Sequence, residues 1–290
     1  MAVAALQRQR VQRRRRRPRS VLRGLAGVVG LIVSAFYLLP LLWVLSLSVR
    51  SSNDIFSSPI VPHSFRPSNY SDAWKTFNLG ELFKNSVLIT SGAVLLGLAL
   101  ALPAGYGFAR YRTRLKDVAF VLVVAELAVP SVAILLPFFL TMKTLGLYDS
   151  RLAVVIAETA FLLPFGIFVL RAYVERIPTE LLDAARVDGA TEWRTFFHIV
   201  LPMLRPAVAT VAIFFTLGVW NGFLLPLVLI RNNGSSTLMV GLSLHSSDLY
   251  GTEWGLIGAG AIIATLPMLV LFIAARRFYV QGLSSGALRG

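Results

Sequence analysis

Six long apolar segments dominate this chain of 290 residues and restrict what it can fold into. They lie at about residues 24–49, 85–109, 118–142, 152–175, 203–230 and 254–275. Each reaches the roughly 20 residues that an α-helix needs to cross the hydrocarbon core of a bilayer. Because a chain in lipid must satisfy its backbone polar groups internally, the sequence predicts an all-α, polytopic membrane protein with about six transmembrane helices.

The composition supports this prediction and excludes several kinds of chemistry. Charged residues make up 14% of the chain and hydrophobic residues 56%, whereas a soluble domain carries about 25% charged residues. The absence of cysteine excludes disulfides, thiolate zinc sites and cysteine nucleophiles. His63, His198 and His245 are scattered along the chain, so we expect no metal site.

The distribution of basic residues argues against a nucleic-acid partner, although the net charge is +14. Nine arginines lie before Leu25, directly ahead of the first apolar segment. Such a cluster is typical of a cytoplasmic anchor that contacts anionic lipid headgroups of the bilayer. The apolar run from Val21 to Val49 is interrupted only by Arg23 and is too long for a signal peptide, so we expect an uncleaved first helix.

The same residues predict the topology. With the N-terminus in the cytoplasm, 21 of the 28 basic residues fall on the cytoplasmic side. The positive-inside rule therefore places both termini and the loop at 179–202 in the cytoplasm. We divide the chain into an Arg-rich cytoplasmic tail at 1–23, a transmembrane domain at 24–276 and a cytoplasmic C-terminal tail at 277–290. Small residues in the second and sixth spans are expected to let helices approach closely.

The loop at 179–202 has the pattern of two short helices. Thr179 is a suitable N-cap, Glu180 favours the first turn, and Gly189 is suited to end the first helix. Thr191 can cap the second helix, which Pro202 closes. The apolar residues of this second helix share one face: Trp193, Phe196, Phe197, Val200 and Leu201. Periodicity alone is equally consistent with helices lying on the inner leaflet and with helices that dock onto a partner.

Spacing within this loop resembles a known motif. Asp183-Ala184-Ala185, Gly189, Ile199 and Leu201-Pro202 stand at the intervals of the EAA motif of ABC importer permeases. The chain departs from that motif at Asp183, where the family usually has a glutamate. The charge is kept, but the side chain is one methylene shorter.

Other short patterns resemble the carbohydrate-type permeases related to the maltose system. Asn85-Ser86 resembles the pair at the start of that family's second span, and Trp220-Asn221 with Phe223 resembles its fifth-span signature. Gly282-Leu283, Gly286-Ala287 and Arg289-Gly290 resemble its C-terminal tail, with Arg289 where lysine is common. The resemblance covers the chain from about residue 24 to its end.

The resemblance implies a subunit of the bacterial plasma (inner) membrane that imports a sugar or oligosaccharide by alternating access. It also implies three partners: a cytoplasmic ABC ATPase dimer, a second permease subunit in a heterodimer, and an extracytoplasmic solute-binding protein. The loop at 179–202 would be the coupling loop, in which Asp183 and Gly189 dock onto the ATPase. Trp193, Phe196 and Phe197 would seat the second helix against the chain's own spans.

This chain cannot supply the ATP chemistry, because it contains no Gly-Lys dipeptide and therefore no P-loop. We expect it not to be an enzyme, to carry no cofactor, and to leave ATP and Mg²⁺ to the partner ATPase.

Candidates for the substrate path are few. Trp220, Asn221 and Phe223 are expected to line it, although Trp220 is at least equally suited to packing between helices. Glu126 falls within the third span, where a carboxylate costs about 2.5–3.5 kcal/mol and should face a cavity or a partner. Glu158 lies nearer a helix end, and we expect it to reach the interface.

Three alternative functions are suggested by parts of the sequence. An ion-coupled secondary transporter would leave the loop at 179–202 unexplained, and an ABC permease for a non-sugar solute would keep it. A hydrolase is suggested only by the Gly-x-Ser-x-Gly pattern at Gly282 to Gly286. That pattern requires a preceding strand and a downstream histidine, and all three histidines lie upstream.

Overall fold

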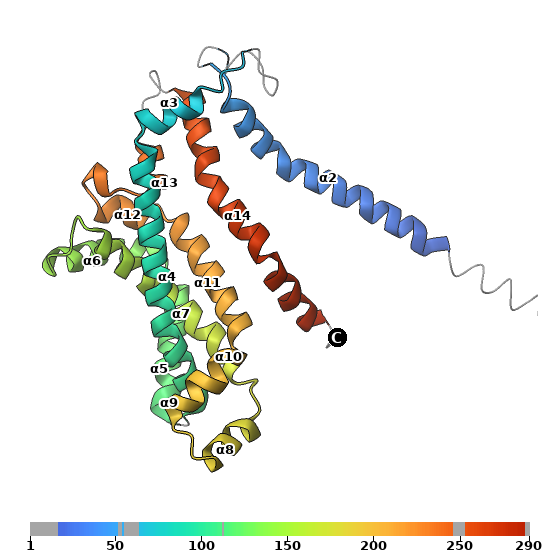
Figure 1. Ribbon diagram of the computed structural model, residues 1–290, viewed down its shortest axis with the longest axis vertical. Coiled ribbons are helices and arrows are strands. Elements are labelled where there is room, and N and C mark those ends of the chain that lie inside the picture. The colour runs from blue at the N-terminus through green and yellow to red at the C-terminus, as the bar shows by residue number, and fades with distance from the viewer. Residues whose placement is uncertain (1–16, 52–53, 55–63, 112, 246–252, 288–290) are drawn as a thin grey trace, which may run out of the picture.

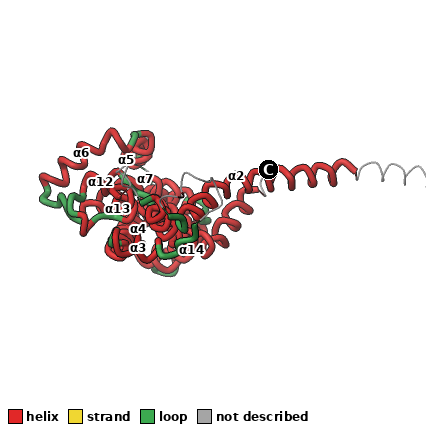
Figure 2. Tube along the Cα trace, turned by 90° about the horizontal axis from the view of Figure 1, so that it is seen from above, coloured by secondary structure: helices red, strands yellow, loops and turns green. Residues whose placement is uncertain are grey.

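The computed structural model describes residues 17–51, 54, 64–111, 113–245 and 253–287. Within these ranges the chain is helical and contains no strand (Figures 1 and 2), so the prediction of an all-α fold is confirmed. The longer helices are α2 (Arg17–Leu47), α4 (Leu79–Arg110), α5 (Arg114–Ala125), α6 (Ser131–Thr144), α7 (Arg151–Val174), α11 (Arg205–Trp220) and α14 (Trp254–Ala287). The shorter helices are α3 (Asn69–Thr76), α8 (Thr179–Val187), α9 (Glu192–Thr195), α10 (Leu201–Met203), α12 (Leu224–Leu229) and α13 (Leu238–His245).

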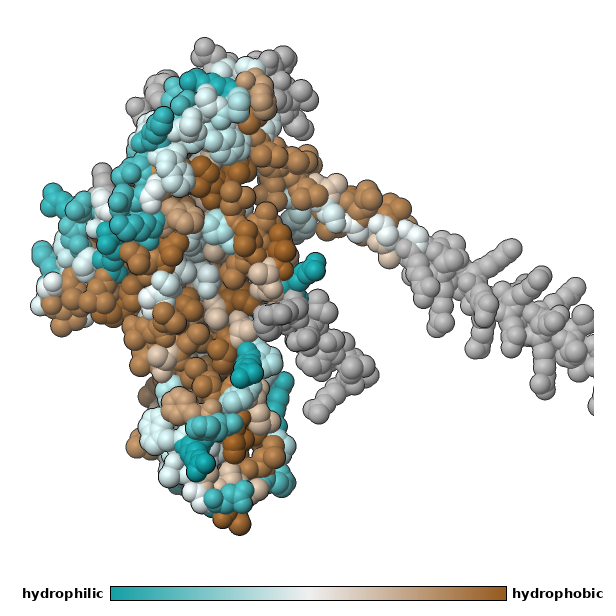
Figure 3. All heavy atoms as spheres, viewed as in Figure 1, coloured by the Kyte–Doolittle hydropathy of each residue, from teal (hydrophilic) through white to brown (hydrophobic). Residues whose placement is uncertain are grey.

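Four of the described helices are long and apolar enough to cross a membrane, and two bent helix pairs raise the number to as many as six. The four are Gly24–Leu47, Leu79–Arg110, Arg151–Val174 and Trp254–Arg276. On the face shown in Figure 3, apolar side chains cover the middle of the bundle, and hydrophilic ones gather toward its two ends and along one flank. A belt of this kind is the surface that lipid requires.

The predicted third span is not one straight helix. Its two halves, Arg114–Ala128 and Ser131–Thr144, meet at an angle of 107°. The break lies at Val129 and Pro130, both in extended backbone conformations. Proline disfavours helical angles at the residue before it, which explains why the helix ends here.

The predicted fifth span is also interrupted. Helix α11 ends at Trp220 and the short helix α12 begins at Leu224, so the span at 203–230 is broken at 221–223. Pro226 contributes to this break, because its nitrogen has no hydrogen to donate to the carbonyl of Gly222 in a continuous helix. Neither of these two predicted spans is therefore a single continuous helix.

The two ends of the bundle carry different elements. Helix α8 lies at one end and α3 at the other, with α4 running between them (Figure 1). Helix α2 leads away from the other helices in both views (Figures 1 and 2), and its side chains from Gly24 to Trp43 are exposed. Residues 1–16 of the predicted Arg-rich tail and Arg289-Gly290 lie outside the described residues.

The centre of the bundle is a close contact of α4, α7 and α11. Phe215 of α11 is completely buried. A Cβ atom at Gly97 of α4 would lie 2.6 Å from the Phe215 ring, and one at Gly166 of α7 would lie 2.6 Å from the same ring. Gly105 lets α4 approach Leu170 of α7 in the same way. The prediction that small residues allow close approach is therefore confirmed for α4.

The same prediction is confirmed for α14. Cβ atoms at Gly255 and Gly258 would lie 2.5 Å from the Arg50 carbonyl oxygen and 2.9 Å from the Ser48 backbone nitrogen. Asn69 of α3 donates its side-chain amide to the Ser48 and Arg50 carbonyls at 3.1 Å and 2.7 Å. The end of α2, helix α3 and the start of α14 thus form one joint.

Adding a methyl group at Gly166 should destabilise the fold, because the buried Phe215 ring occupies the space. We expect Gly166→Ala to lower stability by about 1–3 kcal/mol and to lower the thermal unfolding midpoint measured in detergent. The matched control is Gly107→Ala in α4, where the new Cβ would find its nearest neighbour, a Tyr111 ring carbon, at 4.0 Å. This control should leave the midpoint unchanged or raise it, since alanine favours helix. Equal midpoints for both variants would contradict the packing described here.

Candidate functional site

Helix α8 presents an exposed polar surface at the end of the molecule. It begins at Thr179 after the extended residue Pro178, so the predicted cap at Thr179 lies one residue too late. Leu182 and Ala185 are buried, whereas Asp183 and Ala184 face outward. The first two residues of the predicted docking motif are therefore accessible, and the third holds α8 in place.

Gly189 ends this helix in the way that the sequence predicted. Its φ is +79°, a conformation that glycine adopts without steric cost. The Gly189 amide donates to the Arg186 carbonyl at 3.0 Å, and the Ala190 amide donates to the Ala185 carbonyl at 2.9 Å. These two bonds form a Schellman motif, which fixes the direction in which the chain leaves α8. No described atom would lie within 4 Å of a Cβ atom added at Gly189, so its surroundings are open.

The second part of the loop differs from the predicted single helix. Thr191 caps α9 by accepting a hydrogen bond from the Arg194 amide at 3.3 Å, as predicted. A π-helical turn then spans Phe196–Val200, followed by α10 with Leu201 and Pro202.

Only part of the predicted apolar face is buried against the rest of the chain. Phe196 and Val200 are buried, and Ile199 is half-buried, but Trp193 is 69% exposed and Phe197 is 52% exposed. The prediction that Trp193 and Phe197 seat this segment against the spans was wrong. The buried face is narrower than the spacing assumed, because Trp193 and Phe197, four residues apart, lie beside the side of the segment that buries Phe196 and Val200. The two exposed rings stack on each other, with centroids 6.0 Å apart.

A polar cluster connects α8 and α9 to the end of α4. We call Arg186, Glu192 and Tyr106 the latch. Arg186 donates from Nη2 to Glu192 Oε1 at 2.9 Å, and the Tyr106 hydroxyl donates to Glu192 Oε2 at 2.9 Å. Tyr106 is buried and its ring packs on Phe196 with centroids 5.2 Å apart. The latch therefore joins the exposed helix to a membrane span.

The latch contains a carboxylate that stays ionised near neutral pH. The hydrogen bond from Arg186, followed by that from Tyr106, lowers the pKa of Glu192 below its ordinary value of 4.5. The ion pair between Arg186 and Glu192 stabilises the loop at pH values above the ordinary pKa of Glu192. This stabilisation is lost as the pH falls through the lowered pKa of Glu192 in the folded protein. Arg186 and Glu192 are half exposed or more, so the ion pair orients the loop more than it stabilises the fold.

Arg186 and Glu192 were not among the functional residues predicted from the sequence. Neither residue belongs to the motif, and the bond from Tyr106 to Glu192 joins positions 86 residues apart. The available signal was the position of Glu192 directly after the N-cap Thr191.

The Asn85-Ser86 pair has a structural role in this fold. The Asn85 side-chain amide donates to the carbonyls of Gly234 and Ser236, both at 2.9 Å. The Ser86 hydroxyl accepts a hydrogen bond from the Leu238 amide at 2.8 Å. Together they hold the segment before α13 against the start of α4.

The residues predicted for the substrate path do not meet at one site. Trp220 is buried and donates its Nε1–H to the Ala264 carbonyl at 3.1 Å, so it joins α11 to α14. Asn221 is exposed and bonds to its own helix, and Phe223 lines a different indentation. Glu126 lies in a short 3₁₀ turn, Glu126–Ala128, at the end of α5 and is half-buried.

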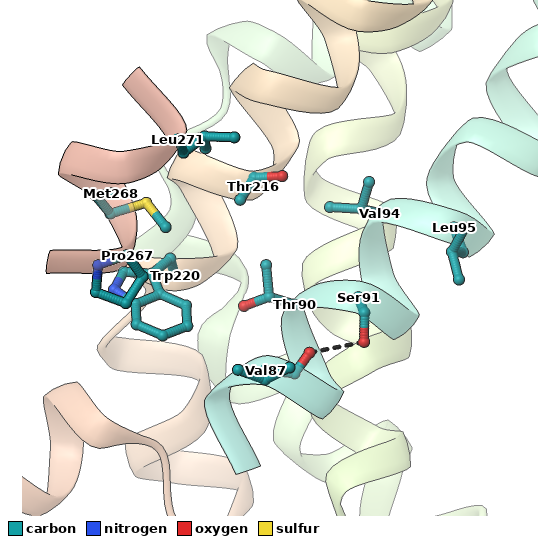
Figure 4. A pocket seen from close by; sticks show the side chains of 10 residues that line it. All are labelled: Val87, Thr90, Ser91, Val94, Leu95, Thr216, Trp220, Pro267, Met268 and Leu271. Carbon is teal, nitrogen blue, oxygen red and sulfur yellow. Dashed lines mark hydrogen bonds between the residues drawn. The ribbon is translucent and has the colours of Figure 1, made fainter. Parts of the chain in front are cut away.

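Trp220 also borders an apolar groove of about 420 Å³ between α4, α11 and α14. Figure 4 shows its ring beside Pro267 and Met268 of α14, with Thr216 one turn earlier on α11 and Thr90 on α4. The other lining residues are Val87, Ser91, Val94, Leu95 and Leu271. Trp220 therefore fits both interpretations, packing between helices and lining an open surface.

Glu158 corrects a further prediction. Instead of reaching the interface it is buried in α7, where it is 7% exposed. In the part of the chain that the structure describes, no group of at least three metal-ligating side chains comes together.

A helical fold with four to six candidate membrane spans and a hinged helical loop at one end is typical of a membrane transport permease. The family model "Binding-protein-dependent transport system inner membrane component" matches residues 93–284. The chain therefore belongs to this family. Membership favours an importer of this kind over the ion-coupled secondary transporter.

Individual relatives match most of the chain. It is 34% identical to the diacetylchitobiose uptake system permease protein NgcG of Streptomyces coelicolor, over 88% of this chain and 85% of that protein. It is 30% identical to the melibiose/raffinose/stachyose import permease protein MelC of Bacillus subtilis, over 89% and 94%. Its fold resembles a chain of a bacterial ABC transporter that imports alginate, with a TM-score of 0.79, 23% identity, and coverage of 91% and 98%.

Removing the charge of Glu192 should loosen the loop. We expect Glu192→Gln to increase amide hydrogen exchange in residues 179–195 by about two- to fivefold, since an exposed pair of this kind contributes up to about 1 kcal/mol. Tyr106→Phe should act in the same direction, because it loses the donor but keeps the ring. Mass spectrometry of the exchanged protein measures the effect. Glu180→Gln, in the first turn of α8, is the control, and exchange in Glu192→Gln no faster than in this control would contradict the role of the latch.

Proposed function

We propose that this chain is a permease subunit of an ATP-driven importer and that α8 docks onto a cytoplasmic ATPase. The observation that carries the proposal is the construction of this end of the molecule. Asp183 and Ala184 face outward, the turn at Gly189 fixes the exit from α8, and the latch ties the loop to α4. A helix held in this way can transmit a displacement that a flexible loop would absorb.

The proposed ATPase is a separate dimer that binds ATP and Mg²⁺, since this chain has no P-loop. Its closure would move α8, and the latch and the buried Phe196 would pass that movement to the spans. Alternating access would follow as a shift of population between inward-facing and outward-facing states.

The proposed orientation puts both termini and α8 in the cytoplasm. Support comes from the 21 of 28 basic residues that fall on that side. Helix α3, at the opposite end of the bundle, would then face outward. One structural neighbour is an alginate ABC transporter in complex with a periplasmic protein bound to an alginate pentasaccharide, with a TM-score of 0.67. We propose a similar solute-binding protein for this chain at the α3 end.

A second permease subunit completes the proposed assembly. Helix α2 stands apart from the bundle with exposed apolar side chains, including Leu31, Phe36 and Tyr37. Lipid and a second subunit are the two surfaces that would cover such a helix.

The proposed substrate is a sugar or oligosaccharide. Its support is in the names of the relatives, which include uptake systems for diacetylchitobiose, for melibiose, raffinose and stachyose, and for lactose. A non-sugar solute stays an alternative, because the chain is also 33% identical to an osmoprotective compounds uptake permease protein of Synechocystis.

Cysteine cross-linking tests the docking surface directly, because the chain has no cysteine of its own. We expect single cysteines at Asp183 or Gly189 to cross-link to the co-expressed ATPase, detected as a shifted band on a gel. A cysteine at Ser71 in α3 is the control and should give no cross-link to the ATPase. If no position from 183 to 193 gives a cross-link, the docking proposal is overturned.

The length of Asp183 can be tested separately. We expect Asp183→Asn to reduce ATP-dependent uptake by about tenfold. A factor of this size corresponds to the loss of one charge-assisted hydrogen bond. Asp183→Glu should retain uptake, since it keeps the charge and has the longer reach of the family's usual residue. Uptake rates in membrane vesicles measure both effects, and equal rates for all three proteins would show that the carboxylate makes no docking contact.

A further inference from the structure

A buried carboxylate on α7 faces both the break before α6 and the break between α11 and α12. Glu158 faces an indentation of about 280 Å³. Its lining comes from three places: Ser131 and Leu135 of α6, Phe161 of α7, and the break between α11 and α12 from Gly222 to Leu225. This indentation is separate from the groove that Trp220 borders, with which it shares no lining residue.

Two backbone breaks open onto this indentation. Ser131 is the first residue of α6 and follows the break at Pro130. Gly222 and Phe223 lie between α11 and α12. Non-helical backbone at membrane depth is tolerated only where it is buried in protein or lines a cavity that contains water. The coincidence of two such breaks on one carboxylate indicates a polar site inside the membrane-spanning region.

Glu158 is placed for a ligand from outside the chain. Among the described residues, no donor forms a hydrogen bond with its carboxylate. A Cβ atom at Gly222 would lie 2.5 Å from Glu158 Oε1, so a larger residue there would displace the carboxylate from this position. An ionisable side chain within a span is costly, and such residues typically mark the path of a substrate or an ion.

The lining defines the chemistry of that ligand. A carboxylate is an acceptor only and requires donors such as hydroxyl groups. Phe161 and Phe223 offer apolar aromatic surface beside it, and none of the described residues that line the indentation is basic. The volume falls near the lower end of the roughly 300–1,000 Å³ typical of ligand pockets. Such a space suits one sugar unit rather than a whole oligosaccharide.

We infer that this indentation is a subsite for an uncharged, hydroxyl-bearing sugar unit, in which Glu158 accepts hydrogen bonds from the ring hydroxyls and repels anionic sugars. The subsite rests on the proposed function. It adds a preference for neutral over acidic saccharides.

Uptake by the assembled transporter tests the subsite. Vesicles that contain the chain with its ATPase, second permease subunit and binding protein are supplied with radiolabelled raffinose or diacetylchitobiose. We expect Glu158→Gln to raise the KM of uptake about tenfold, the loss of one charge-assisted hydrogen bond. The matched control is Glu81→Gln, a residue at the exposed start of α4 that pairs only loosely with Lys84, at 3.9 Å.

The two proposals fail in different ways in this experiment. A wild-type transporter with no ATP-dependent uptake of either sugar would overturn the proposed sugar import, and the subsite with it. A wild-type transporter that imports one of them while Glu158→Gln keeps the same KM would overturn the subsite alone.

A labelling experiment gives a readout other than the uptake rate. Cysteine at Ser131 is treated with a cationic and with an anionic methanethiosulfonate reagent of similar size. We expect the cationic reagent to react about tenfold faster, because Glu158 lies in the same indentation, and the transported sugar to slow the reaction. Replacing Glu158 by glutamine should abolish the difference in rate.

Cysteine at Val132 is the matched control for labelling. This neighbouring residue of α6 is 65% exposed and does not line the indentation, so it should show neither charge preference nor protection. Equal rates for the two reagents at Ser131→Cys, or no protection by a sugar that the vesicles import, would overturn the subsite.

Discussion

Close packing of α4, α7 and α11 around the Phe215 ring is the interaction on which the rest of the structure depends. Within lipid there is little hydrophobic gain in bringing helices together, so their contact relies on van der Waals packing and small residues. Gly97, Gly166 and Gly105 provide the space, and Phe215 fills it. This central contact holds the ends of the three helices in fixed relative positions.

Both functional regions depend on that rigid centre. Tyr106, at the far end of α4, holds Glu192 and through it Arg186, so the position of α8 follows the position of α4. Glu158 lies on α7, and the break that ends α11 passes beside it at Gly222. A movement of α8 would therefore reach the proposed sugar subsite through helices that already pack on one another.

Much of this architecture followed from periodicity and spacing. The apolar segments predicted the helical fold, and glycine chemistry predicted the turn at Gly189. The prediction failed where the buried face was narrower than the spacing suggested and where a helix was broken. Trp193 and Phe197 are exposed beside the side on which Phe196 and Val200 are buried. Glu158 is buried because the two breaks bring Ser131 and Gly222 against α7, and no local pattern in α7 reveals that contact.

By itself, the sequence determined the class of fold, the number of apolar segments and the family. Segment length and motif spacing can be read directly from the chain. An apolar segment of about 20 residues in lipid has to form a helix, because only a helix satisfies its backbone hydrogen bonds internally. Only the tertiary structure decided which polar groups meet. The Tyr106–Glu192 bond and the indentation at Glu158 join residues far apart in the chain, and their contacts depend on how the helices bend and pack.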